Sequence, residues 1–213
     1  MKRLAPSKEE IALLPAFDGL SIGQVRVPAT ADQFEAAAAA IRAARVVGFD
    51  TESKPLFDVG ATSDGPHVVQ FATPTEAFVC QVHRVEGLPF VVDLLQADDV
   101  VKVGFGLSSD HKHIRRKFGV EPRSVVDLND VFRGAGFRAS IGVRAAIAIL
   151  FERRFLKSKR QTTSNWALPK LDDKQLLYAA NDAWAALCVH SALDRLRADD
   201  AAGAPDESAT GPA

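Results

Sequence analysis

Short apolar stretches and longer helical patterns alternate along the chain and predict where strands and helices lie. Apolar, largely β-branched residues fill 45–51, 67–72, 76–82 and 100–105, which is typical of buried strands. Only the three residues Thr73-Pro74-Thr75 separate the second and third stretches, so these two predict a β-hairpin. A shorter β-branched stretch, 124–126, predicts an edge strand.

Helical periodicity predicts the remaining elements. Thr30 begins a Ser/Thr-x-x-Glu/Gln capping box, and the alanine-rich run 36–44 after it favours a helix. Pro89 suits the first turn of a second helix. The further helices are predicted from about Pro89 to Gln96, Ser109 to Phe118, Asp127 to Arg133, Ile141 to Phe151 and Asp172 to Arg197.

The order of these elements predicts one α/β domain in which helices flank a mixed central β-sheet. We assign the folded domain to residues 29–197. The scattered prolines and glycines of residues 1–28 predict an irregular N-terminal segment. Residues 198–213 lack an apolar period, so we expect a disordered C-terminal tail.

The composition is that of a globular protein that can bury its own core. Of the 213 residues, 47% are hydrophobic and 25% are charged, and the net charge of −1 excludes a global basic field, so a nucleic acid would be held by local patches. Cys80 and Cys188 lie in apolar surroundings and predict two buried thiols in a reducing compartment. No segment resembles a secretion signal or a membrane span. We expect no membrane partner, a cytoplasmic location and a monomer in preference to an oligomer.

Two carboxylates at the end of the first strand are candidates for chemistry. Asp50 and Glu52 are two positions apart, so on a strand their side chains point to the same face. Two carboxylates held this close repel each other unless a cation lies between them, and oxygen ligands suit a hard divalent cation. An Asp-x-Glu pair is common on protein surfaces, so this pair needs matching acids elsewhere in the chain.

Two further acids, elsewhere in the chain, are candidates for the same site. Asp110 lies just after a predicted strand, where it could also serve as a helix-capping carboxylate. Asp182 lies inside the last helix among apolar residues, one turn after Tyr178. A carboxylate on a buried helix face requires a partner, either a buried salt bridge or a metal ion.

Together these residues resemble a known family. Asp50-x-Glu52, Asp110 and Tyr178-x-x-x-Asp182 resemble, in order and spacing, the three motifs of the DEDDy 3′–5′ exonucleases. Ser164-Asn165-Trp166 with residues 175–182 is similar to the signature that ribonuclease D shares with the Werner-syndrome exonuclease domain. The resemblance covers residues 30 to 196. It implies a ribonuclease-H-like fold and the removal of nucleoside monophosphates from the 3′ end of nucleic acid.

The resemblance also implies roles for the matching residues. Asp50, Glu52 and Asp182 would hold the first of two Mg²⁺ or Mn²⁺ ions. Asp50 would bridge to the second ion, which Asp110 would support. Tyr178 would orient the attacking water, because its ordinary pKa of about 10 makes it a poor base at neutral pH.

Substrate-binding residues are predicted around these motifs. Thr51 and Phe105 lie inside matching motifs. Leu56 stands where the family places an apolar wedge against the terminal base, although it could equally anchor its loop in the core, and Phe57 is a neighbouring candidate for the wedge.

Two basic clusters could contact the phosphate backbone. We favour the cluster at residues 153–160, including Lys157 and Arg160, over the cluster at residues 112–117, because it lies in a loop-like stretch before the third motif. Lys112 departs from the family, since the Werner-type domain has an aromatic residue there.

The sequence leaves two alternatives open. A nucleic-acid-binding module of the same fold could have lost catalysis, although all five catalytic positions are filled. The choice between DNA and RNA is also undecided, because no residue identifies itself as a reader of the 2′-hydroxyl. The sequence does not decide between single and double strands or between Mg²⁺ and Mn²⁺ either.

Overall fold

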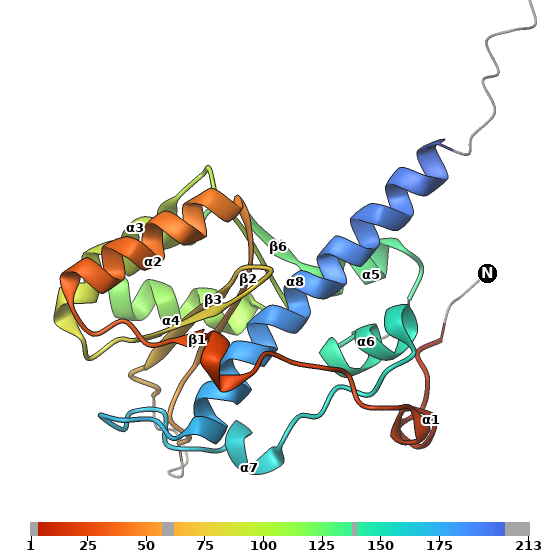
Figure 1. Cartoon of the computed structure of the whole chain (residues 1–213), viewed down its shortest axis with the longest axis horizontal. Coiled ribbons are helices and arrows are strands. Elements are labelled where there is room, and N and C mark those ends of the chain that lie inside the picture. Colours follow the sequence, from red (N-terminus) through yellow and green to blue (C-terminus); the bar gives the residue numbers. More distant parts are fainter. Residues whose placement is uncertain (1–3, 57–61, 138–139, 203–213) are drawn as a thin grey trace, which may run out of the picture.

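The computed structural model describes residues 4–56, 62–137 and 140–202, which fold around one mixed six-stranded sheet (Figure 1). The strands are β1 (Val25–Arg26), β2 (Val46–Glu52), β3 (Val68–Ala72), β4 (Ala77–Gln81), β5 (Val101–Gly104) and β6 (Val125–Asp127). Their order in the sheet is β1-β4-β3-β2-β5-β6. The strand β3 runs antiparallel to β2 and β4, whereas β2, β5 and β6 are mutually parallel. The mixed sheet and the hairpin predicted from the sequence are therefore confirmed.

Helices cover both faces of this sheet. They are α1 (Lys8–Leu13), α2 (Ala31–Ala44), α3 (Leu88–Gln96), α4 (Ser108–Phe118), α5 (Leu128–Gly134), α6 (Val143–Phe151), α7 (Lys159–Thr162) and α8 (Asp173–Ala202), with short 3₁₀ turns η1 (Ile22–Gln24) and η2 (Val85–Gly87). The helices α2, α3 and α4 pack on one face, and α8 crosses the other, with α5 and α6 beside it (Figure 1).

Strand alternation decides which side chains meet which helices. On β2, Val47 and Phe49 belong to the apolar core beneath α2, α3 and α4. The side chains that alternate with these two, including that of Asp50, therefore point to the opposite face of the sheet and face α8. On β3, Val69 and Phe71 likewise belong to the first core, whereas Val68 and Ala72 pack in the core beneath α8.

A glycine allows α8 to lie unusually close to the sheet. A Cβ atom on Gly48 would stand 1.8 Å from the carbonyl oxygen of Ala183, so no larger residue fits there without moving the helix. The facing helix is correspondingly small, since Ala179, Ala180 and Ala183 are fully buried. This close approach brings β2 and α8 together at Gly48 and Ala183. Asp50 is two residues from Gly48 and Asp182 is next to Ala183, so the two acids are brought together as well.

Two boundaries differ from the prediction. The expectation of an irregular segment at 1–28 is wrong for α1 and for β1, which joins the sheet beside β4. The signal for α1 was present, because Ser7 and Glu10 form a reciprocal capping box in which Ser7 N donates to the Glu10 carboxylate over 2.7 Å. The helix α8 continues to Ala202, beyond the predicted end, and residues 203–213 of the predicted tail lie outside the described residues.

The prediction of two buried thiols is confirmed for Cys80, whereas Cys188 is only partly buried. Trp166 is a core residue, with 1% of its surface exposed. Among the helices that the structure describes, none combines the length and the apolar character needed to span a membrane.

Candidate active site

Three carboxylates from two distant parts of the chain converge at the end of β2. One oxygen each from Asp50, Glu52 and Asp182 lies within 4.8 Å of the others. Asp50 and Glu52 share a face because they are two residues apart on β2, and Asp182 reaches them from the third turn of α8. The predicted meeting of these three acids is thus observed in the fold.

Asp110 lies beside this cluster but is not part of the group of three. It is 8% exposed in the first turn of α4, and it accepts a hydrogen bond from the Thr51 hydroxyl. Its charge is the largest single contribution, after burial, that raises the pKa of Asp50. Asp110 therefore adds a fourth carboxyl group at the side of Asp50.

Burial and mutual repulsion disfavour the ionised form of these acids. Burial, with the charges of Asp110 and Asp182, raises the pKa of Asp50 well above its ordinary value. The same two causes, burial and the neighbouring carboxylates, raise the pKa of Glu52 to about 10. Burial also raises the pKa of Asp182. A cluster with this electrostatic character is stabilised by added positive charge.

Two basic side chains supply part of that charge. The Lys157 ammonium lies 2.6 Å from Asp182 Oδ2, and the charges of both Lys157 and Arg144 act to lower the pKa of Asp182. Arg144, on α6, also donates a hydrogen bond to the carbonyl of Lys157 and so fixes the approach of that loop. Lys157 was predicted from its basic cluster. Arg144 was missed, because one arginine on an amphipathic helix carries no signal of its own.

Tyr178 lies one turn before Asp182 on the same face of α8. Its hydroxyl is 3.0 Å from the Thr162 hydroxyl, and the Lys157 ammonium is 5.2 Å from the centre of its ring. Burial, followed by the charge of Asp182, raises the pKa of Tyr178, so the phenol keeps its proton at neutral pH. Trp166 packs against the ring, with 5.8 Å between ring centres, and holds it in place.

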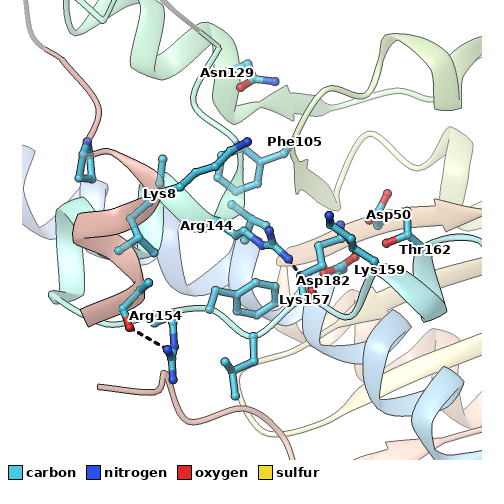
Figure 2. A pocket seen from close by; sticks show the side chains of 18 of the residues that line it. Lys8, Asp50, Phe105, Asn129, Arg144, Arg154, Lys157, Lys159, Thr162 and Asp182 are labelled. Atoms are coloured by element: carbon cyan, nitrogen blue, oxygen red, sulfur yellow. Dashed lines mark hydrogen bonds and ion pairs between the residues drawn. The ribbon is translucent and has the colours of Figure 1, made fainter. Parts of the chain in front are cut away.

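A cavity of about 860 Å³ opens beside the acids (Figure 2). Asp50 and Asp182 lie at one end of it, and the cations Lys157 and Lys159 stand beside them. Phe105 lines the cavity, as expected for a substrate-binding residue. A cavity of this size is in the range of ligand-binding clefts, about 300–1,000 Å³.

The other predicted substrate contacts have mixed placements. The Thr51 hydroxyl donates a hydrogen bond to the Asp110 carboxylate. Leu56 is 42% exposed, so it does not anchor its loop in the core. Arg160 is exposed on α7, where its neighbour Lys159 faces the cavity instead. Phe57 lies outside the described residues.

The donor set suits a hard divalent cation. All three converging groups are carboxyl groups, and the pKa of each is raised even with Lys157 beside them. Oxygen-only ligands favour Mg²⁺ and Mn²⁺ over Zn²⁺, which prefers nitrogen and sulfur. The residues present therefore fit the metal that the arrangement implies.

Comparison with known proteins gives an independent result. Residues 25–196 match the family model of the 3′–5′ exonuclease domain. A 3′–5′ exonuclease of Arabidopsis thaliana is 29% identical over 154 residues, which cover 70% of this chain and 53% of that protein. A bifunctional 3′–5′ exonuclease/ATP-dependent helicase of Mus musculus is 28% identical over 153 residues, covering 71% of this chain and 11% of that protein. The chain thus spans from about a tenth to about half of the length of these relatives.

A solved structure agrees on the fold. The Trypanosoma brucei RNase D, determined in complex with the RNA U12, superposes with a TM-score of 0.70 at 20% identity, covering 96% of this chain and 77% of that one. The ribonuclease-H-like fold inferred from the sequence motifs is confirmed by this likeness and by the six-stranded mixed sheet.

Proposed function

We propose, since the chain belongs to the 3′–5′ exonuclease family, that it hydrolyses the last phosphodiester bond at the 3′ end of a nucleic acid and releases nucleoside monophosphates. The observation that carries the proposal is the convergence of Asp50, Glu52 and Asp182 at one end of a cavity lined by cations. Carboxylates alone would repel the negatively charged phosphodiester. Such a site therefore suits a phosphate only when cations lie beside the carboxylates.

We assign the site to the DEDDy pattern, with Asp50, Glu52, Asp110 and Asp182 as its acids and Tyr178 as its tyrosine. Asp50, Glu52 and Asp182 would hold one divalent ion, and Asp50 with Asp110 a second. Bound there, Mg²⁺ or Mn²⁺ would supply the Lewis acidity that phosphodiester hydrolysis needs at neutral pH.

The side chains around the acids have separate tasks in this proposal. Tyr178 keeps its proton, so its hydroxyl orients the attacking water by hydrogen bonding instead of removing a proton. Lys157 and Arg144 bring positive charge to the position where the non-bridging oxygens of the phosphate become more negative. Thr51 holds Asp110 through its hydroxyl and so positions that acid beside Asp50.

A binding module without catalysis is the alternative in another class. The complete set of acids and the tyrosine speaks for the enzyme, since a module that only binds nucleic acid has no need of several carboxylates facing a phosphate. The RNA bound by the Trypanosoma brucei RNase D supports RNA as one substrate. DNA remains the alternative substrate.

The test is digestion of matched 3′-labelled DNA and RNA strands in Mg²⁺ or Mn²⁺. We expect the label to be released first as a mononucleotide, and Asp50→Asn to lower the rate by at least about 10²-fold, because it removes a ligand shared between the proposed ions. Asp130→Asn is the matched control, since Asp130 is an exposed carboxylate that pairs only with Arg133 among the described residues. A strand digested equally fast by Asp50→Asn would show that the mechanism is wrong, and a strand bound but never cut by the wild type would favour the binding module.

A further inference from the structure

The cavity extends from the acids to a wall that lies outside the matched residues 25–196. This wall consists of the segment around α1, which contributes Pro6, Lys8, Ile11 and Ala12 to the lining. The family model therefore does not account for one side of the candidate substrate cavity.

Arg154 attaches this segment firmly to the body of the protein. Its guanidinium donates to the carbonyl of Ala12 over 2.7 Å. Its backbone also forms a bridge with the segment, since Arg154 N donates to Pro15 O over 2.7 Å and Phe17 N donates to Arg154 O over 2.9 Å. A helix of six residues is not stable alone in water, so these contacts fix the position of α1.

The end of the segment is held by the helix that carries Asp182. The ring of Phe17 packs against Trp184 of α8 and Phe151 of α6, with ring centres 5.7 and 5.3 Å apart. Asn181, the neighbour of Asp182, accepts a hydrogen bond of 2.7 Å from Leu20 N. The wall and the acids are thus positioned by the same helix, and we expect them to keep a constant spacing.

Lys8 is the charged group that this wall presents to the cavity. Figure 2 shows its side chain extending from α1 into the cavity toward Phe105. It forms no ion pair with any residue in the described ranges, so its charge is available to an anion. Phe105, Val143 and Phe155 provide apolar surface in the same cavity.

We infer that Lys8 binds a backbone phosphate of the strand upstream of the 3′-terminal nucleotide. This inference rests on the proposed function. A single strand offers alternating phosphates and unpaired bases, which match a cation next to apolar and aromatic side chains.

Steady-state kinetics on strands of two and of ten nucleotides test this role. Lys8→Ala should raise KM for the ten-nucleotide strand about 3- to 10-fold and leave kcat unchanged, because the contact is remote from the reacting bond. For the dinucleotide, which has no upstream phosphate, Lys8→Ala should lower kcat/KM by less than about twofold. The dependence of log(kcat/KM) on log[salt] should become shallower by about 0.7 for the longer strand.

The matched control is Arg123→Ala, which removes one surface cation that pairs with Asp98 far from the cavity. Equal kinetics for Lys8→Ala and Arg123→Ala, or an equal loss on both strand lengths, would overturn the role of Lys8. A wild type that digests no strand would instead remove the proposed function itself.

Discussion

Glu52 is held against Asp50 and Asp182 in an environment that resists its ionisation. Its pKa in the folded protein, about 10, is far above the ordinary value of 4.5. Between these two values the folded state binds more protons than the unfolded state. The free energy of unfolding therefore decreases as pH rises from about 5 toward 8 when no metal is present.

We predict that Glu52→Gln is more stable than the wild type at pH 8 in EDTA, because the glutamine does not have to take up a proton when the protein folds. Its Tm should be higher by a few degrees, corresponding to about 1–2 kcal/mol, and should change less between pH 5 and pH 8 than that of the wild type. Thermal unfolding followed by circular dichroism measures both. The same scans with Mn²⁺ should reverse the order, since the variant lacks a ligand. A wild type whose Tm is the same at pH 5 and pH 8 in EDTA would contradict this account.

At the scale of elements, the contact between β2 and α8 determines whether the site forms. These elements carry Asp50 and Glu52 on one side and Asp182 on the other, and Gly48 lets them approach. Because the obstacle to a side chain at position 48 is the backbone of Ala183, the strain cannot be relieved by a rotamer change.

We predict that Gly48→Ala destabilises the protein by about 2–4 kcal/mol and lowers exonuclease activity more than its effect on folding explains. The reason is that α8 must shift and carries Asp182 away from Asp50. Gly134→Ala is the matched control, since a Cβ atom at that position meets nothing within 4 Å. Urea unfolding and activity of the folded fraction measure the two effects. If Gly48→Ala behaves like Gly134→Ala, the close approach is not a requirement of the site.

At the scale of the whole molecule, the sheet separates the two cysteines. Cys80 belongs to the core under α2, α3 and α4, whereas Cys188 lies on α8 on the opposite face. Burial raises the pKa of the Cys80 thiol to about 12 and that of the Cys188 thiol to about 11, so neither is a ready nucleophile at neutral pH.

We predict that oxidising conditions form no internal disulfide. The Tm should agree within about 1 °C with and without dithiothreitol, because bridging would require the sheet to be displaced. Thiol titration should find two free thiols in the unfolded protein, and the same thiols should react slowly in the folded protein. Loss of both thiols on oxidation of the monomer, or a Tm that depends on the reductant, would show that the two sides are not separated as described.

Much of this protein was determined by local features of its sequence. The strand and helix periods predicted the sheet, the hairpin and the last helix, because burial on one face imposes a period of 2 or 3.6 residues. The spacing of Asp50, Glu52, Tyr178 and Asp182 predicted which groups share a face, since backbone geometry alone decides this within one element. Helix α1 was missed although its capping box was readable, because so short a helix depends on contacts with distant residues.

Only the tertiary structure decided what meets across elements. The ion pair of Lys157 with Asp182, the place of Arg144 and the wall that carries Lys8 join residues far apart in the sequence. The close contact of Gly48 with Ala183 does the same. No local pattern encodes such contacts, because they follow from how helices pack against the sheet and from how closely small residues allow them to approach.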